Sequence, residues 1–286
     1  MTSGLLVVDK PGGITSHGVV AIVRRATGIK KAGHAGTLDP MATGVLVVAL
    51  GQATRLVRYV QDGAKEYFAT IQFGIATDSL DADGVETERA PMSFSVDDLR
   101  QTLEKFKGEL VQVPPMVSAL KVGGKRLYDL ARAGQEIVRE PRQVSITELE
   151  LTDFDAQPEF PIGTIRVVSS KGTYIRTLAD DIARDLGGRA HLIGLRRTRV
   201  GPFGLEGAAS LDDLAEWHGH LLPPSEAVSE LSKWFVTDDE AESISHGRAL
   251  FAPDEGGPWA MLGSGDELMG IYRRDGVQAV AEVVLS

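Results

Sequence analysis

Cysteine is absent from the 286-residue sequence. The chain can therefore form neither disulfides nor thiolate zinc sites, and it cannot use a cysteine nucleophile. The absence is compatible with a reducing compartment. Any catalysis has to use other side chains.

Long apolar runs are also absent. The N-terminus offers only Leu5 to Val8 before the first charged residues, which is too short for a signal peptide. The longest apolar stretch elsewhere, Val45 to Leu50, has the length of a buried strand, whereas a membrane-spanning helix needs about 20 apolar residues. We expect a soluble, cytoplasmic protein without membrane contact. No obligate protein partner is inferred, and a monomer is expected.

Basic residues number 30 against 40 acidic ones, and the net charge of −10 argues at first against a nucleic-acid partner. Much of the acidity lies in the tail, because residues 230–286 hold eleven acidic and four basic residues. Two internal segments are basic: residues 166–199 have eight Lys or Arg against three Asp, and residues 121–142 have six bases against three acids. Both could face a polyanion, and both fit solvated helix faces equally well.

Apolar periodicity predicts a mixture of strands and helices. We expect strands at residues 5–9, 45–50, 67–73, 144–151 and 164–169. Helices are expected after caps at Ser16 and Ser95, at residues 52–61 and 174–186, and around 128–133. Because the elements do not alternate as in a doubly wound parallel sheet, we expect an α/β fold of the α+β type with a mixed, largely antiparallel central sheet flanked by helices.

A domain boundary is expected between Pro202 and Pro224, where Gly, Ala and Pro cluster around one short helix. From Leu231 onward the sequence is acidic and typical of strands. The chain is long enough for one large domain and a small one. We therefore predict a small β-rich C-terminal domain.

The segment 30–43 is rich in glycine and small residues and is predicted to be a loop. Within it, Asp39 precedes Pro40, which favours an extended backbone, while Gly36 and Gly44 allow sharp turns on both sides. A rigid loop beside a buried strand is a common place for a catalytic carboxylate. Asp-Pro is also an ordinary turn starter, so the local pattern fits either role.

Four other side chains are candidates for a site. His34 could be a metal ligand, a base or a turn residue, and the absence of cysteine and of a spaced carboxylate set disfavours a metal. Tyr67 and Tyr174 fit core aromatics as well as site residues. Arg176 lies just inside an apolar helix, where a guanidinium needs a buried anionic partner.

Seven ordered segments resemble a known family. They are residues 8–16 (VDKPGGITS), 33–44 (GHAGTLDPMATG), 65–67 (KEY), 114–121 (PPM and SALK), 124–128 (GKRLY), 171–176 (KGTYIR) and 195–197 (LRR). One such motif would be weak, but seven in this order are specific. Together they resemble the bacterial tRNA pseudouridine synthases of the TruB type, closely over roughly residues 4–200 and loosely in the tail.

The resemblance implies the pseudouridine synthase fold and the conversion of uridine 55 in the T-loop of tRNA to pseudouridine. The reaction breaks the bond between uracil N1 and ribose C1′, turns the base and rejoins it through C5. It needs an ionised carboxylate near C1′ or C2′, a proton acceptor and a pocket that retains the detached uracil. The implied partner is the tRNA T-arm, and neither a cofactor nor a metal is expected.

By resemblance, Asp39 is the catalytic carboxylate, and the sequence leaves open whether it attacks C1′ or removes a ribose proton. Arg176 is implied to pair with Asp39 and to lower its pKa by about 1 to 3 units. Tyr67 is implied to stack on the target base near the C5 proton. His34 is implied to touch phosphate when the uridine is flipped out.

Other positions are implied to contact the RNA. Tyr174 and Leu195 match residues that line the uracil pocket. The segment from about 114 to 142 matches an insertion that grips the T-arm. Contacts to the RNA backbone are expected from four basic residues, Lys10, Lys121, Lys125 and Arg126.

The tail, residues 226–286, resembles a PUA-type domain that follows a catalytic domain of residues 1–225. Within it, residues 230–286 hold eleven acidic and four basic residues, a local charge of −7, which argues against extensive phosphate contact. It could pack against the catalytic domain or touch only the acceptor end of the tRNA.

Three other functions stay open at this point. Glycoside cleavage also acts at an anomeric carbon, and it would need a second carboxylate such as Asp78, Asp81 or Asp83, which lie in a segment typical of an acidic turn. A non-catalytic RNA-binding or folding factor would tolerate loss of Asp39. A guide-dependent RNA synthase is disfavoured because the chain carries its own gripping insertion.

Overall fold

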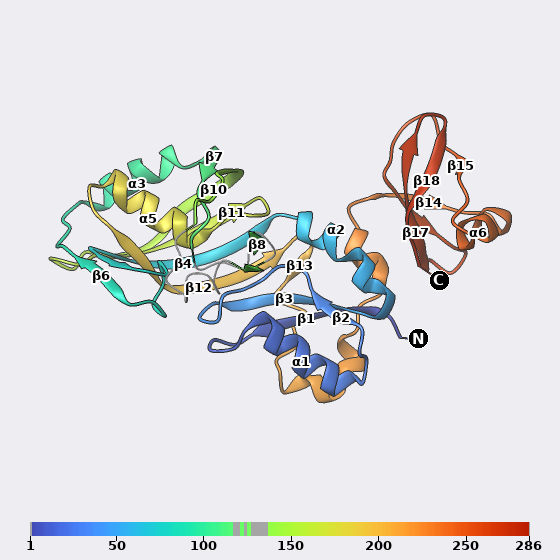
Figure 1. Cartoon of the computed structure of the whole chain (residues 1–286), viewed down its shortest axis with the longest axis horizontal. Coiled ribbons are helices and arrows are strands. Elements are labelled where there is room, and N and C mark those ends of the chain that lie inside the picture. Colours follow the sequence, from blue (N-terminus) through green and yellow to red (C-terminus); the bar gives the residue numbers. More distant parts are fainter. Residues whose placement is uncertain (1, 117–120, 123–124, 127–136, 286) are drawn as a thin grey trace.

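The computed structural model describes residues 2–116, 121–122, 125–126 and 137–285 (Figure 1). None of the described helices is long and apolar enough to cross a membrane. The predicted helix around 128–133 lies outside the described residues.

The main sheet has nine strands in the described chain. Seven follow one path, in the order β1 (Gly4–Lys10), β3 (Thr43–Leu50), β12 (Ala190–Val200), β4 (Lys65–Phe73), β11 (Ile162–Ser169), β10 (Arg142–Asp155) and β7 (Gly108–Gln112). The other two are β2 (Ala32–His34), which pairs with β3, and β13 (Phe203–Gly204), which pairs with β12. β12 pairs with β3 in parallel, and the other pairings in this sheet are antiparallel. The predicted mixed, largely antiparallel central sheet is confirmed.

Helices flank this sheet (Figure 1). They are α1 (Ser16–Thr27), α2 (Val57–Asp62), α3 (Val96–Lys105) and α5 (Ile175–Asp185), with 3₁₀ segments at Gly51–Leu56, Asp213–His220 and Pro224–Val228. Apolar side chains of α1 pack against one face of β1 and β3, and those of α3 and α5 pack against β4, β10 and β11. The amphipathic periodicity of each helix therefore places its apolar stripe on the sheet.

The helix caps agree with those predicted from the sequence, with one exception. The predicted cap at Ser95 is confirmed as a capping box with Asp98, and Gly28 ends α1 in the left-handed conformation. The N-cap of α1 is Thr15, whose side chain accepts a hydrogen bond from the Gly18 amide, so the prediction of Ser16 is wrong. Ser16 is buried, and its hydroxyl forms hydrogen bonds with the backbone of Leu38.

The predicted loop at residues 30–43 contains the short strand β2. Its backbone pairs with β3, with Ala32 opposite Leu50 and His34 opposite Val48. The prediction of an unbroken loop is therefore wrong in its first part. Three residues in a glycine-rich segment are too few to show the alternation of side chains from which a strand is predicted.

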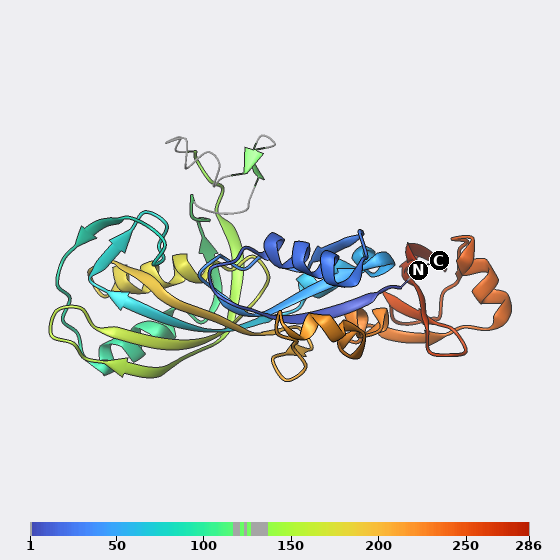
Figure 2. The same ribbon diagram turned by 90° about the horizontal axis from the view of Figure 1, so that it is seen from below.

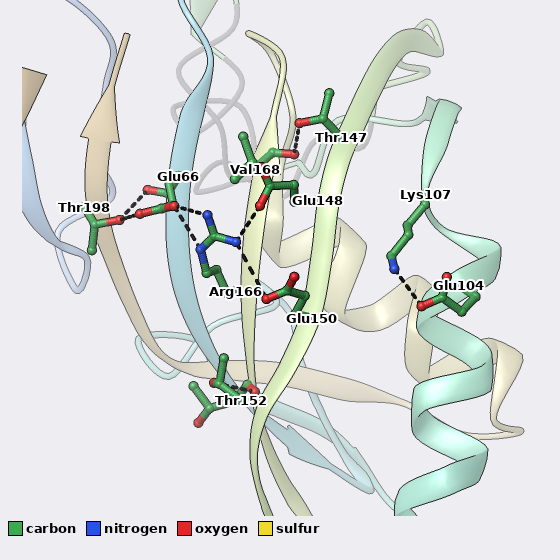
Figure 3. Close-up of polar contacts among 11 residues, drawn as sticks. Glu66, Glu104, Lys107, Thr147, Glu148, Glu150, Thr152, Arg166, Val168 and Thr198 are labelled. Carbon is green, nitrogen blue, oxygen red and sulfur yellow. Dashed lines mark hydrogen bonds and ion pairs between the residues drawn. The ribbon is translucent and has the colours of Figure 1, made fainter. Parts of the chain in front are cut away.

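A cluster of ion pairs and hydrogen bonds joins four strands on one face of the sheet (Figure 3). Arg166 on β11 donates to Glu66 on β4 at 2.6 and 2.9 Å and to Glu148 on β10 at 2.5 Å. Thr198 on β12 donates to the second carboxylate oxygen of Glu66 at 2.6 Å. Because side chains alternate along a strand, Glu66 points away from the face on which Tyr67 lies.

A second sheet follows residue 231. Its order is β14 (Ser232–Phe235), β16 (Trp259–Leu262), β17 (Leu268–Asp275), β18 (Gln278–Val284) and β15 (Leu250–Phe251), and α6 (Asp238–Ser245) packs on it. The predicted β-rich C-terminal region is present. Both chain ends lie near the junction of the two sheets (Figures 1 and 2).

Four more short strands complete the described chain. β5 (Ile75–Thr77) pairs with β6 (Glu86–Arg89), and β8 (Lys121–Val122) pairs with β9 (Lys125–Arg126). Residues 78–84, predicted as an acidic turn, form the connection between β5 and β6, in which Leu80 adopts a positive φ of 62°.

Candidate active site

The loop that carries Asp39 is held by two buried side chains from the start of the chain. The Lys10 ammonium donates to the carbonyl oxygens of Pro11, Ile14 and Pro40 at 2.8 to 3.1 Å. The Ser16 hydroxyl donates to the Leu38 carbonyl at 3.0 Å and accepts from the Leu38 amide at 2.8 Å. The backbone on both sides of Asp39 is therefore fixed.

A third buried side chain, Arg197 on β12, supports the same loop from the sheet. Its guanidinium donates to the carbonyl oxygens of Val45 at 2.8 Å and Gly36 at 3.1 Å. Gly44 has a φ of 104°, and a Cβ there would lie 2.1 Å from the Arg197 carbonyl oxygen. Only glycine allows the loop and β12 to approach this closely.

Arg176 joins Asp39 to a second carboxylate. Its Nε lies 3.0 Å from Asp39 Oδ2, and its Nη2 donates to Asp39 Oδ1 at 3.2 Å. Its Nη1 donates to the Ser79 carbonyl at 2.7 Å and lies 3.3 Å from Asp81 Oδ2. The guanidinium is 3 % exposed, so it is the buried cation with the anionic partner that the sequence required.

Burial raises the pKa of the Asp39 carboxyl above its ordinary value. The Arg176 guanidinium opposes this effect, and the negative charge of Asp81 adds to it. Arg176 therefore acts in the expected direction and lowers the Asp39 pKa, but burial outweighs this effect, so the expectation of a net pKa below the ordinary value is wrong.

Asp39 faces a cavity of about 670 Å³ that is lined by the Asp39 loop, the end of α2, the start of β10, the turn between β11 and α5, and the start of α5. This volume is within the range of small-molecule sites. The other predicted residues that line it are Tyr67, Tyr174, Arg176 and Leu195. Five side chains predicted from distant parts of the sequence thus meet at one cavity.

Comparison with known proteins places the chain in a family. The family described as TruB family pseudouridylate synthase (N terminal domain) matches residues 24–175, and the tRNA pseudouridylate synthase B C-terminal domain matches residues 176–227. The chain belongs to the TruB family of pseudouridylate synthases. The family predicted from the seven motifs is confirmed.

Curated TruB relatives match most of the chain. The tRNA pseudouridine synthase B of Symbiobacterium thermophilum is 51 % identical over 247 residues, which cover 86 % of this chain and 82 % of the relative. The protein of the same name from Thermobifida fusca is 43 % identical over 291 residues, which cover 99 % of this chain and 95 % of the relative.

Solved structures agree with the TruB assignment. A structure described as an H/ACA RNP bound to a substrate RNA containing 2′-deoxyuridine has a TM-score of 0.76 and 27 % identity, over 99 % of this chain and 85 % of that chain. A structure described as a Cbf5-Nop10-Gar1 complex has a TM-score of 0.76 and 28 % identity, over 99 % of this chain and 84 % of that chain. The expected pseudouridine synthase fold is confirmed.

His34 is separated from the other predicted residues of this TruB-family site. It lies on β2 with its ring edge-to-face against His17, 5.2 Å between centroids, and it is not among the residues that line the cavity. In the described part of the chain, no group of three or more His, Asp or Glu side chains is arranged to hold a metal ion.

Lys10 was expected to contact the RNA backbone, and the structure contradicts this. The side chain is fully buried, and its ammonium is directed at the Asp39 loop. Burial lowers the pKa of Lys10 to about 8. Its position therefore supports the loop and leaves no surface for a phosphate.

The expected RNA contacts in the insertion cannot be placed on the structure. Lys121 lies on β8 and Lys125 and Arg126 lie on β9, which form a short antiparallel ladder. Their side chains are outside the described part of the chain, so these contacts stay a prediction.

The basic segment 166–199 contributes less free positive charge than its composition suggested. Six of its eight bases form ion pairs with carboxylates of this chain: Arg166, Lys171, Arg176, Arg184, Arg189 and Arg196. Pairing with Asp or Glu neutralises these bases locally. The segment is therefore neither a surface of unpaired bases that could bind a polyanion nor a helix face whose charges are only solvated.

Two residues of the site were missed. Asp81 is buried against Arg176, although its acidic neighbours are typical of an exposed turn. Gln112, which is also buried, accepts from the Tyr174 amide at 3.0 Å and donates to its carbonyl at 3.4 Å, and so fixes the start of α5. Asp81 could have been predicted as a second partner of Arg176, because a buried guanidinium needs more than one acceptor.

Proposed function

We propose that this TruB-family enzyme converts uridine 55 in the T-loop of tRNA to pseudouridine, with Asp39 as the catalytic carboxylate. The observation that carries the proposal is the carboxylate of Asp39, held by Arg176 in the lining of a cavity of about 670 Å³. Relatives named tRNA pseudouridine synthase B, 51 % and 43 % identical, support tRNA as the substrate.

Asp39 acts on the ribose of a uridine that leaves its stack and enters the cavity. The Asp39 side chain is 31 % exposed, so part of it is accessible although Arg176 contacts both of its carboxylate oxygens. Either first step, attack on C1′ or removal of a ribose proton, uses the ionised carboxylate. A base inside a folded loop has to be extruded to reach such a group.

Tyr67 and Leu195 are assigned to the uracil ring. Both are largely buried in the cavity wall, at 9 % and 8 % exposure, where an aromatic and an aliphatic side chain can enclose a flat base. Tyr67 is also the proposed residue for transfer of the C5 proton. Tyr174 completes the pocket, and His34 is assigned to the phosphate of the flipped nucleotide.

The remaining parts of the chain are assigned to RNA binding. Residues 1–225 form the catalytic domain, in which the insertion from about 114 to 142 closes on the T-arm through Lys121, Lys125 and Arg126. Residues 226–286 form a PUA-like domain. The enzyme works in the cytoplasm as a monomer, without a cofactor and without an obligate protein partner.

Glycoside hydrolysis fits the site less well. Two carboxylates line the cavity in the described chain, Asp39 and Asp62. Asp62 is exposed and paired with Lys171, while the buried Asp81 is held behind Arg176. Among the residues that the structure describes, no second carboxylate therefore faces Asp39 as the reaction of paired carboxylates requires.

A tritium-release assay tests the proposal. T-arm RNA labelled at C5 of uridine should release tritium with the protein alone, and mapping should place one pseudouridine at position 55. Binding of this RNA without release would refute the enzymatic proposal. Release from another position would refute the assignment to uridine 55.

A further inference from the structure

One exposed ion pair joins two walls of the cavity. Lys171 Nζ lies 2.7 Å from Asp62 Oδ1, and the two side chains are 65 % and 57 % exposed. Asp62 ends α2, while Lys171 lies in the turn between β11 and α5. Both residues line the cavity, so their contact lies at its rim.

The backbone on the Asp62 side is fixed by a buried lysine. The Lys65 ammonium donates to the Gly63 carbonyl at 2.7 Å and to the Gln61 carbonyl. Lys65 is 6 % exposed. The peptide groups on both sides of Asp62 are therefore held while its carboxylate stays in solvent.

The backbone on the Lys171 side is fixed as well. Ser170 donates its amide to the Ser145 carbonyl at 2.8 Å, and its hydroxyl accepts the Ser145 amide at 2.8 Å. The Thr173 hydroxyl donates to the Ser170 carbonyl at 3.0 Å. A change of partner at the rim thus requires movement of the two side chains only.

The charge of Asp62 is unfavourable for the proposed substrate. The cavity is lined by five bases and by Asp39 and Asp62. Asp39 is compensated by Arg176, and its carboxylate is needed for the chemistry. Asp62 instead places a negative charge at the rim, where the phosphates of the RNA must pass.

We propose that Asp62 holds Lys171 in the free enzyme in the place of a phosphate, and that an RNA backbone phosphate displaces the Asp62 carboxylate to bind Lys171. Lys171 is then a phosphate-binding residue, and Asp62 is an internal competitor that weakens RNA binding. This inference rests on the proposed function, since the displacing ligand is the T-arm of the substrate. An exposed lysine exchanges one anionic oxygen for another at little cost.

Replacement of Asp62 tests the competition. Asp62→Asn should lower the Kd of a T-arm transcript about twofold to fivefold at low salt, the range expected for loss of one exposed ion pair. Glu104→Gln is the matched control, because Glu104 pairs with Lys107 at 2.6 Å outside the cavity and the charge change is the same. Unchanged or weaker binding by Asp62→Asn, relative to this control, would overturn the inference.

Replacement of Lys171 tests the phosphate contact. Lys171→Gln should raise the Kd and reduce the slope of log Kd against log salt by about 0.7 to 0.9, the contribution of one phosphate contact. In the Lys171→Gln background, the gain from Asp62→Asn, measured against Glu104→Gln, should be smaller than the gain in the presence of Lys171. An unchanged slope, or a full gain from Asp62→Asn without Lys171, would contradict displacement by phosphate.

The same measurements separate this inference from the proposed function. If the wild-type protein forms pseudouridine in the T-arm transcript and Asp62→Asn binds no tighter, the inference alone fails. If the wild-type protein forms no pseudouridine there, the proposed function fails, and the inference fails with it. Thermal unfolding of both variants checks that the rim is intact.

Discussion

Arg176 Nε lies 3.0 Å from Asp39 Oδ2, and Nη1 of the same guanidinium lies 3.3 Å from Asp81 Oδ2. A single buried cation therefore links the carboxylate in the cavity to a carboxylate behind it. Because the guanidinium is planar and binds through several N–H groups, it fixes the orientation of Asp39 as well as balancing its charge.

Arg176→Lys should preserve the positive charge and lose the geometry. A lysine ammonium cannot contact both Asp39 oxygens and still reach Asp81 and the Ser79 carbonyl. We expect kcat to fall by about 100-fold, as for other small displacements of reacting groups, with RNA affinity nearly unchanged. Single-turnover kinetics with T-arm RNA measure this loss.

Arg184→Lys is the control for that experiment. Arg184 pairs with Asp180 at 2.9 Å and is 55 % exposed, away from the cavity lining. It should keep wild-type turnover. Equal losses in the two variants would show that the Arg176 geometry has no special part in catalysis.

Asp81→Asn should change the pH dependence of turnover. Burial raises the pKa of Asp39, so activity that needs the ionised form is lost, as the pH falls, above the ordinary aspartate value of 3.8. The charge of Asp81 contributes to that increase. Removing it should lower the Asp39 pKa and move the acid limb of the profile to lower pH.

A single-turnover rate profile for Asp81→Asn, with Asp83→Asn as control, measures the shift. Asp83 is exposed, and its replacement should leave the acid limb in place. A limb that moves to higher pH in Asp81→Asn would mean that Asp81 acts on Asp39 mainly by positioning Arg176.

Lys10→Met should alter the pH dependence of stability. Burial lowers the pKa of Lys10 to about 8 in the folded protein, against an ordinary value of 10.5. Between these pH values the unfolded chain binds more protons, so the free energy of unfolding should rise with pH. Lys65, with a pKa lowered to about 8, adds a similar contribution.

Denaturant unfolding of Lys10→Met across this pH range should show a shallower rise than the wild type, because only the contribution of Lys65 stays. Lys233→Met, at an exposed position of the second sheet, should keep the wild-type slope. Identical slopes in all three proteins would contradict a buried, charged Lys10.

Much of the fold followed from side-chain periodicity. Strands such as β3 and β4 and helices such as α5 bury one face or both, and burial imposes a regular apolar pattern on the sequence. The strands β2, β5 and β13 were not predicted, because two or three residues carry no measurable alternation, and the longer strands β7 and β12 were also not predicted. Their pairing depends on backbone neighbours that are distant in sequence.

The site was predictable where a local pattern implied a partner. A guanidinium inside an apolar helix required an anion, and the family resemblance implied that this anion is Asp39. Lys10 and Asp81 were misjudged because both types of residue are usually exposed, and only tertiary packing buries them against the Asp39 loop and Arg176. Charge counting by segment could not show which bases are paired internally.

The proposed role of Asp39 as the catalytic carboxylate is tested directly by comparing Asp39→Asn with the wild type. Asp39→Asn keeps the size of the side chain and removes the charge, so binding of T-arm RNA should stay within severalfold of the wild type. Release of tritium from C5-labelled uridine 55 should be abolished. Release of tritium by Asp39→Asn at the wild-type rate would show that Asp39 is not the catalytic carboxylate.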